Sequence, residues 1–79
     1  MIRTVLDEIR KIKDFNTILN LCHLKETPDG SKVKYIMNSG RLKNMKYEEF
    51  AEYLDRPVVE TDSYYDQFDD LDVIFITFI

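Results

Sequence analysis

The seven residues Val73–Ile79 constrain the fold more than any other part of the chain, because six of them are apolar. The run Val-Ile-Phe-Ile-Thr-Phe-Ile is too short for an ordinary helix, and it is rich in β-branched and aromatic side chains. It shows no alternation of polar and apolar residues, as is typical of a strand that is buried on both faces. We therefore predict that this segment is a central strand of a β-sheet.

The length of the chain predicts one small domain spanning residues 1–79, since domains typically contain roughly 100–150 residues. Hydrophobic residues make up 44% of the chain, which has only two glycines and two prolines. This composition is typical of a folded protein rather than a disordered one. A domain of this size buries only about 60–65% of its unfolded surface, so we expect a thin core.

The N-terminal segment carries the spacing of an amphipathic helix. Apolar residues recur three or four positions apart and form a single stripe, which consists of Ile2, Val5, Leu6, Ile9 and Ile12. The sequence therefore predicts a helix over residues 2–13. The stripe could continue through Phe15, Ile18, Leu19 and Cys22 as one long helix.

A β-hairpin is the alternative for residues 17–39, and we favour it. Pro28 suits the second position of a type I turn, and Gly30 can adopt the positive φ that follows such a turn. Val33, Tyr35 and Met37 alternate with other residues at the period of a half-buried strand. A long helix would leave this strand without an antiparallel neighbour.

A second helix is predicted from an N-cap at Asn44 to Leu54, and Pro57 prevents its simple continuation. Val58 and Val59 suggest a short edge strand. Ser63 and Asp66 have the spacing of a capping box, and the apolar spacing from Tyr64 through Phe68 and Leu71 predicts a turn or two of helix.

These elements together predict an α+β fold in one small domain, with the order helix–hairpin–helix–strand. We expect a mainly antiparallel sheet of three or four strands, with the helices on one face.

Several functional classes are disfavoured by the residues present. Cys22 and His23 are adjacent, so on a strand they face opposite sides and cannot pair as nucleophile and base. One cysteine and one histidine cannot build a typical zinc site, and two glycines cannot form a glycine-rich phosphate loop. We therefore expect neither an enzyme nor a bound cofactor.

The unpaired cysteine fits a reducing cytoplasm, and no apolar run approaches the roughly 18 residues of a membrane span.

Charge is distributed very unevenly along the chain. Residues 47–79 contain ten of the fifteen carboxylates and one cation, Arg56, whereas residues 1–46 contain ten cations and five carboxylates. The two parts therefore carry −9 and +5, which sum to the net charge of −4. Such asymmetry informs about binding partners and association rates rather than about fold.

The acidic part predicts a binding surface for a basic partner. The candidate residues are carboxylates interleaved with tyrosines, namely Glu60, Asp62, Tyr64, Tyr65, Asp66, Asp69 and Asp70, with Glu48, Glu49 and Glu52 of the second helix as secondary candidates. Carboxylates two apart on an extended strand stand roughly 6–7 Å from each other, a spacing similar to that of successive phosphates. A solvated face that keeps the domain soluble explains the same residues. A metal site is not predicted, because the EF-hand pattern of Gly and Glu is missing.

Three hypotheses for function follow. The preferred one is a non-catalytic interaction protein that docks on a basic protein surface, and its specific version is a nucleic-acid mimic, of the kind phages or mobile elements encode, that inhibits a DNA- or RNA-processing protein. The second is a structural or homo-oligomeric module whose basic and acidic parts attract each other. The third is direct nucleic-acid binding through Arg10, Lys32, Lys34, Arg41 and Lys43, which the net negative charge disfavours.

Overall fold

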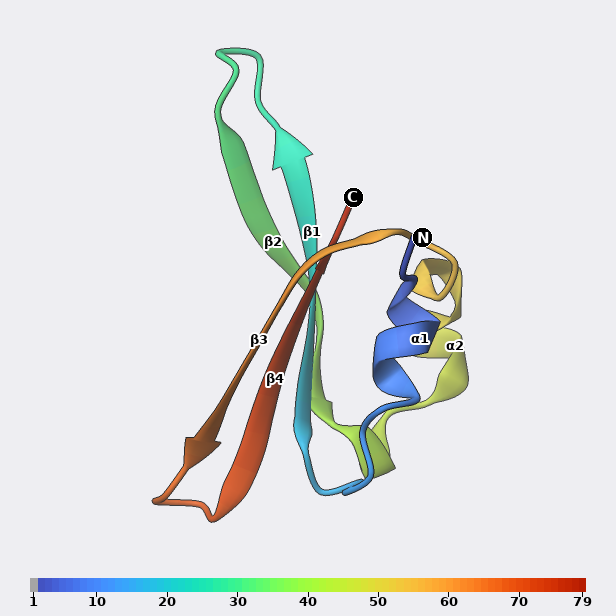
Figure 1. Cartoon of the computed structure of the whole chain (residues 1–79), viewed down its shortest axis with the longest axis vertical. Helices are drawn as coiled ribbons and strands as arrows, with labels where there is room; N and C mark the ends of the chain where they lie inside the picture. Colours follow the sequence, from blue (N-terminus) through green and yellow to red (C-terminus); the bar gives the residue numbers. More distant parts are fainter. Residues whose placement is uncertain (1) are drawn as a thin grey trace.

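A four-stranded mixed sheet makes up most of the structure, a computed structural model that describes residues 2–79 (Figure 1). Strand β1 (Ile18–Glu26) pairs antiparallel with β2 (Lys32–Arg41), and β3 (Val58–Asp66) pairs antiparallel with β4 (Leu71–Phe78). The two hairpins join through a parallel pairing of β1 with β4, which gives the order β2-β1-β4-β3. The α+β prediction is thus supported at the level of a sheet with a few short helices, and β4 is central as predicted.

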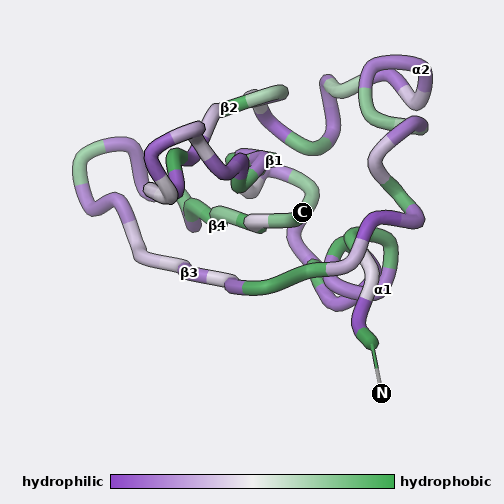
Figure 2. The backbone as a smooth tube through the Cα atoms, turned by 90° about the horizontal axis from the view of Figure 1, so that it is seen from above, coloured by the Kyte–Doolittle hydropathy of each residue, from purple (hydrophilic) through white to green (hydrophobic). Residues whose placement is uncertain are grey.

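The helices are shorter than the sequence predicts. Helix α1 spans Val5–Ile9, and the second helical segment is divided into η1 (Leu42–Asn44), α2 (Tyr47–Phe50) and η2 (Ala51–Tyr53). Helices this short depend on tertiary packing rather than on intrinsic propensity. Figure 2, which looks along the long axis, places α1 and α2 on the same side of the sheet.

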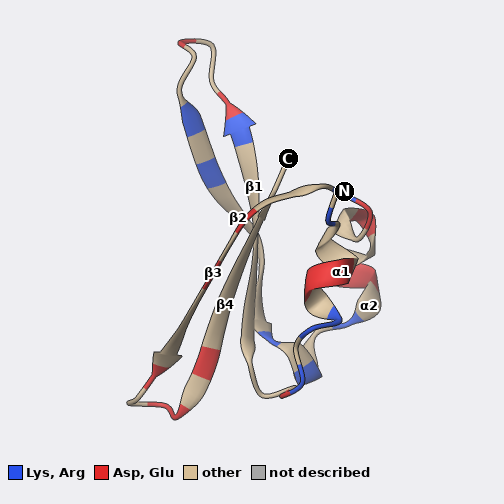
Figure 3. Ribbon diagram, viewed as in Figure 1, with Lys and Arg blue, Asp and Glu red and all other residues tan. Residues whose placement is uncertain are grey.

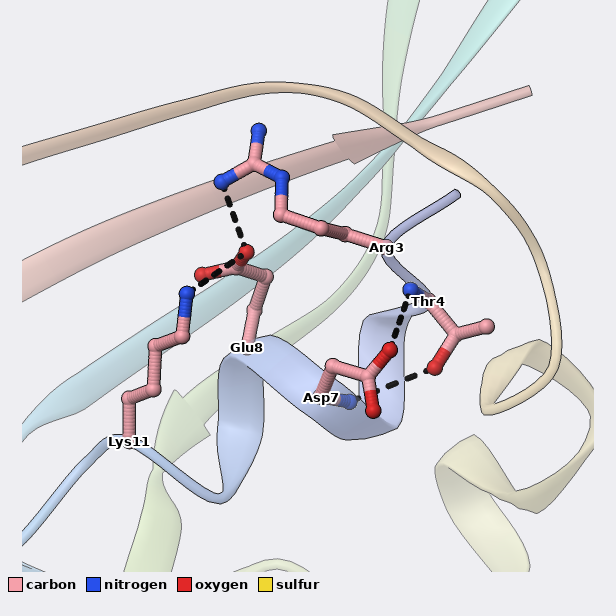
Figure 4. Close-up of polar contacts among 5 residues, drawn as sticks. All are labelled: Arg3, Thr4, Asp7, Glu8 and Lys11. Atoms are coloured by element: carbon pink, nitrogen blue, oxygen red, sulfur yellow. Dashed lines mark hydrogen bonds and ion pairs between the residues drawn. The ribbon is translucent and has the colours of Figure 1, made fainter. Parts of the chain in front are cut away.

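A capping box fixes the start of α1 (Figure 4). The backbone N–H of Asp7 donates to Thr4 Oγ1 over 3.3 Å, and the N–H of Thr4 donates to Asp7 Oδ2 over 2.9 Å. The second of these bonds lowers the pKa of Asp7. The helix ends at Ile9 instead of Lys13 because Ile12 N–H bonds back three residues, to Ile9. The predicted stripe faces the core in part, with Val5 fully buried and Ile9 and Ile12 packed against the core, whereas Ile2 is exposed.

The core lies between the helices and one face of the central strands. Leu19 and Leu21 of β1 lie beside Ile76 and Phe78 of β4, and Val5 of α1 covers them. Phe78 contacts two other rings. The ring of His23 stacks on it with a centroid distance of 5.3 Å, and the ring of Tyr53 packs against it with a centroid distance of 5.1 Å.

The first hairpin confirms the choice of strand over long helix for residues 18–26. Gly30 has φ of +86°, as the predicted turn requires. Thr27 N–H donates to the carbonyl of Ser31 and closes the loop. However, β2 is not half-buried, because Val33, Tyr35, Ile36 and Met37 are all exposed. The strand lies at the edge of the sheet, and the hairpin extends beyond the end of β4.

Two local predictions in the second half of the chain are wrong. Asn44 ends η1 rather than capping a helix, and the N-cap of α2 is Lys46, without a side-chain bond. Ser63 does not start a helix, because it pairs with Ile74 in the middle of β3. Residues 58–66 therefore form a full strand rather than a short one, and the region supplies a second hairpin.

An ion pair between Lys34 and Glu60 spans the sheet face that lies opposite the helices. Asn20, Cys22 and Thr77 alternate with the core residues and lie on this face, yet they are buried. Lys34 Nζ of β2 contacts Glu60 Oε2 of β3 over 2.7 Å, although β1 and β4 separate the two strands in the sheet. The sheet must therefore curl until its two edges approach each other above Cys22. Burial there raises the pKa of the Cys22 thiol.

The core assignment predicts very different costs for the same substitution at two isoleucines. Ile76→Ala removes a fully buried side chain and should lower the free energy of unfolding by about 2–5 kcal/mol. Ile2→Ala changes a side chain that is 75% exposed and should cost less than about 0.5 kcal/mol. Urea unfolding monitored by circular dichroism measures both. Equal losses for the two variants would contradict this core.

Candidate protein-binding surface

The β3–β4 hairpin carries the main candidate residues, and its turn lies at one end of the molecule. Strand β3 is an edge strand, and its residues from Val59 to Tyr65 are all exposed. In Figure 3, acidic residues follow this strand and crowd the turn that joins it to β4. We define the acidic hairpin surface as the seven predicted residues on this hairpin, which are Glu60, Asp62, Tyr64, Tyr65, Asp66, Asp69 and Asp70.

Strand alternation divides this surface between the two faces of the sheet. Glu60, Asp62 and Tyr64 pair with alternate residues of β4 and share the face that lies opposite the helices. Tyr64 also stacks on Phe75 at 6.3 Å, which holds its ring against the sheet. Tyr65 lies on the other face, where its hydroxyl donates a hydrogen bond to Asp70.

The turn holds some of its carboxylates in structural roles. Asp66 Oδ1 accepts the backbone N–H of Phe68 over 3.0 Å and that of Asp69 over 3.3 Å. Asp70 has φ of +54°, a conformation that Asp and Asn tolerate better than most residues. Asp66 and Asp70 therefore shape the hairpin, whereas Asp62 and Asp69 make no side-chain ion pair among residues 2–79.

Glu60 differs from the other acidic residues because it has a cation partner. The hydrogen bond from Lys34 lowers the pKa of Glu60 below its ordinary value of 4.5 and raises the pKa of Lys34 above 10.5. Asp62, two residues along the same face, adds to the rise at Lys34. Glu60 thus contributes less uncompensated charge to the acidic hairpin surface than the sequence indicates.

Phe68 at the tip of the turn is a feature that the sequence-based prediction missed. Its spacing from Tyr64 and Leu71 predicts a buried position on a helix, but its side chain is 94% exposed. A small domain loses the hydrophobic stabilisation of a ring that it leaves in water. Aromatic residues are enriched at the centres of protein interfaces. Asp72, which pairs with Tyr65 across the hairpin, is a further carboxylate of this end.

The secondary candidates Glu48, Glu49 and Glu52 do not join this surface. They lie on α2 and η2, on the opposite side of the molecule from the β3–β4 turn (Figures 1 and 3). The carboxylates of residues 47–79 therefore form two separate groups. The basic residues of the third hypothesis are also dispersed, since Lys32 and Lys34 start β2 and Arg41 ends it.

A shallow groove lies beside α1, and Figure 4 shows the polar contacts of Glu8, which lines it. It holds about 180 Å³ between α1 and β3–β4, and Ile12, Ile74 and Ile76 line its floor. Glu8 at its rim is only 9% exposed, and both Arg3 (2.8 Å) and Lys11 (3.3 Å) contact its carboxylate. The groove is smaller than the roughly 300 Å³ of an ordinary ligand pocket, and its one buried carboxylate already has partners.

Residues 2–79 do not form the geometry of a Cys–His catalytic pair, a metal site or a membrane-spanning helix. Cys22 and His23 occupy successive strand positions with opposite orientations. No three His, Cys, Asp or Glu side chains of the described chain converge in a way that could hold a metal ion. None of the described helices has the length and apolar character needed to cross a membrane.

Comparisons with known proteins do not assign the chain to a class. Neither the models of protein families, nor the curated proteins, nor the solved structures gave a match to this sequence and fold.

The Lys34–Glu60 pair predicts a specific pH dependence. Because the folded pKa of Glu60 is depressed, its stabilising effect is present above pH 4.5 and is lost as the pH falls through the lowered value. The pKa of Lys34 is raised, so its effect is present below pH 10.5 and is lost as the pH rises past the raised value. An NMR titration of the Glu60 side-chain carboxyl carbon should give a midpoint below 4.5 in the wild type.

Lys34→Met should move this midpoint upward toward 4.5, because it removes the ammonium group and keeps the apolar stem. Lys32→Met is the matched control, since Lys32 lies on the same strand and makes no ion pair in the described chain. A Glu60 midpoint that is unchanged by Lys34→Met would show that the two edges of the sheet do not meet in solution.

Proposed function

We propose that this protein is a non-catalytic binding protein that docks its β3–β4 hairpin on a basic surface of another protein. The observation that carries the proposal is the concentration of carboxylates without cation partners around an exposed aromatic ring. Asp62 and Asp69 have no ion pair in residues 2–79, and Phe68 at the tip of the same hairpin is almost fully exposed. An apolar anchor inside a charged rim is the usual anatomy of a protein interface.

The hairpin is also well placed for this role. Its turn lies at one end of a molecule that measures 40 × 25 × 25 Å, away from both helices. The bonds that Asp66 accepts and the Tyr65–Asp70 contact hold the turn in one conformation. A surface that is ordered before binding loses less conformational entropy in the complex.

The specific version of the proposal is that the partner's surface is a groove that binds nucleic acid. Glu60 and Asp62 lie two residues apart on one face of an extended strand, which separates them by roughly 6–7 Å. A row of negative groups at this spacing on a rigid support resembles a phosphate backbone. Tyr64 continues the same row and offers a ring that can contact the walls of such a groove.

Two triple variants with equal changes in net charge test the proposal. The hairpin triple carries Asp62→Asn, Asp69→Asn and Asp72→Asn, and it spares Asp66 and Asp70 because these two side chains hold the turn. The helix triple carries Glu48→Gln, Glu49→Gln and Glu52→Gln. An oligo-arginine peptide of defined length serves as the probe of basic chemistry, and titration calorimetry measures its affinity.

The hairpin triple should weaken binding of the peptide by roughly 3- to 160-fold, because each exposed charge pair contributes about 0.2–1 kcal/mol. The helix triple should change the affinity much less, and the affinity of the wild type should fall as salt is added. Equal losses in the two triples would mean that only net charge matters, and the hairpin would then not be the binding surface.

Capture experiments from cell lysate then test the nucleic-acid version. Basic proteins retained by the wild type, and lost with the hairpin triple, should be released by added duplex DNA or by RNA if the hairpin occupies their nucleic-acid groove. Retention that is insensitive to both nucleic acids would exclude the mimic while leaving a basic partner of another kind.

A further inference from the structure

The Lys34–Glu60 ion pair brings a cation of the first hairpin onto the acidic hairpin surface of the second. Lys34 lies 26 residues before Glu60, and its Nζ approaches Oε2 of that carboxylate to 2.7 Å. The other two ion pairs of residues 2–79 both involve Glu8 and stay beside α1. Within the described chain, Lys34 is therefore the one cation that an ion pair joins to the acidic hairpin surface.

Lys34 acts on the strand part of this surface. Its hydrogen bond to Glu60 raises the pKa of Lys34, and the charge of Asp62 adds to the rise. Glu60 and Asp62 lie on the face opposite the helices, in the row that Tyr64 continues. Asp69, by contrast, lies in the turn beyond the last paired residues of the hairpin. Lys34 thus compensates the row of carboxylates on β3 and leaves the tip uncompensated.

We propose that Lys34 is an autoinhibitory contact, which occupies Glu60 in the free protein and must be replaced before a basic partner engages the strand part of the acidic hairpin surface. This inference rests on the proposed function and names what regulates that surface. In the free protein, the ammonium group of Lys34 takes the place of a basic group of the partner.

The pair is accessible enough and weak enough to be replaced. The side chains of Lys34 and Glu60 are 46% and 48% exposed, so a partner can reach the carboxylate from solvent. Exposed pairs of this kind are weak. Lys34 nevertheless belongs to the same chain, which gives it a high effective concentration beside Glu60. The contact therefore lowers the affinity for a basic partner without preventing binding.

The geometry of the pair favours arginine as the group that replaces Lys34. Lys34 Nζ is a single point charge, and its contact with Glu60 is to one oxygen, Oε2. A guanidinium group can bind both oxygens of a carboxylate through two parallel N–H bonds, which is the stronger arrangement. An arginine side chain of the partner therefore competes with Lys34 better than a lysine would.

Titration calorimetry with the oligo-arginine peptide compares Lys34→Met with Lys32→Met. Both variants remove one positive charge from β2, but only Lys34 makes an ion pair in the described chain. Lys34→Met should bind the peptide roughly 1.4- to 5-fold more tightly than Lys32→Met, which is the factor that one exposed ion pair supplies. With Glu60→Gln added to both variants, this difference should largely be lost, because Lys34 then has no carboxylate to occupy at residue 60.

A measurement on the wild type gives a readout that does not depend on the folding of any variant. Saturating peptide should shift the NMR signal of the Lys34 Cε methylene group, because the ammonium group beside it leaves Glu60. The corresponding signal of Lys32 should stay in place. Circular dichroism checks that the lysine variants and their Glu60→Gln combinations keep the fold of the wild type.

Two results would each overturn the autoinhibitory contact while leaving the proposed function intact. One is equal affinity of Lys34→Met and Lys32→Met for the peptide, and the other is a Lys34 signal that does not move at saturation. In both cases the hairpin triple would still bind more weakly than the helix triple. If the two triples bind equally, the proposed function itself fails, and the inhibition by Lys34 fails with it because the hairpin is then no binding surface.

Discussion

The parallel pairing of β1 with β4 is the contact on which the rest of this structure depends. Each of the other two pairings joins neighbouring strands of one hairpin, and an isolated hairpin is at best marginally stable in water. Residues Ile18–His23 and Val73–Phe78 lie far apart in the sequence, and their pairing places Leu19 and Leu21 beside Ile74 and Ile76. The apolar floor formed in this way is what α1, α2 and η2 pack against, and helices of four or five residues depend on such packing for most of their stability.

The same topology leaves both hairpins with an exposed outer strand. Because β1 and β4 fill the centre, β2 and β3 form the two edges, and their sequences treat this exposure differently. Strand β3 alternates carboxylates with small hydroxyl residues, whereas β2 exposes apolar residues that are interrupted by Lys34 and end in a bulge at Met37. The Lys34–Glu60 pair connects the edges across the sheet, and it covers Cys22 and Thr77 where no helix does. An exposed ion pair of this kind contributes little energy by itself, so it is a consequence of the curl of the sheet rather than its cause.

The parts of the fold that local sequence determines were predictable, and those that depend on long-range pairing were not. The apolar run of β4 and the Thr27–Gly30 turn carry their own signals, because burial on both faces and a positive φ each select particular residues. Strand β3 has no such signal, since residues exposed on both faces need no alternation, and Ser63 with Asp66 then imitates a helix cap. The acidic candidates were visible as charge, but neither the partner of Glu60 nor the exposure of Phe68 could be read from spacing. Both depend on how the sheet curls and on where its second hairpin ends.

The acidic residues of β3 have one consequence that holds whether or not a partner exists. If β3 paired antiparallel with β3 of a second copy about Asp62, the two Asp62 carboxylates would face each other, and an axis at Thr61 would set Glu60 against Asp62. Like charges directly opposite destabilise a sheet, so these carboxylates keep the edge free of other copies. Protection of an edge, however, needs only charges along the strand. It gives no reason to place Asp69 and Asp70 in the turn beyond the last paired residue, or to leave the ring of Phe68 in water beside them. The carboxylates of the strand are explained by the fold, whereas Asp69 and the exposed ring of Phe68 at the tip are the residues for which we propose a partner surface.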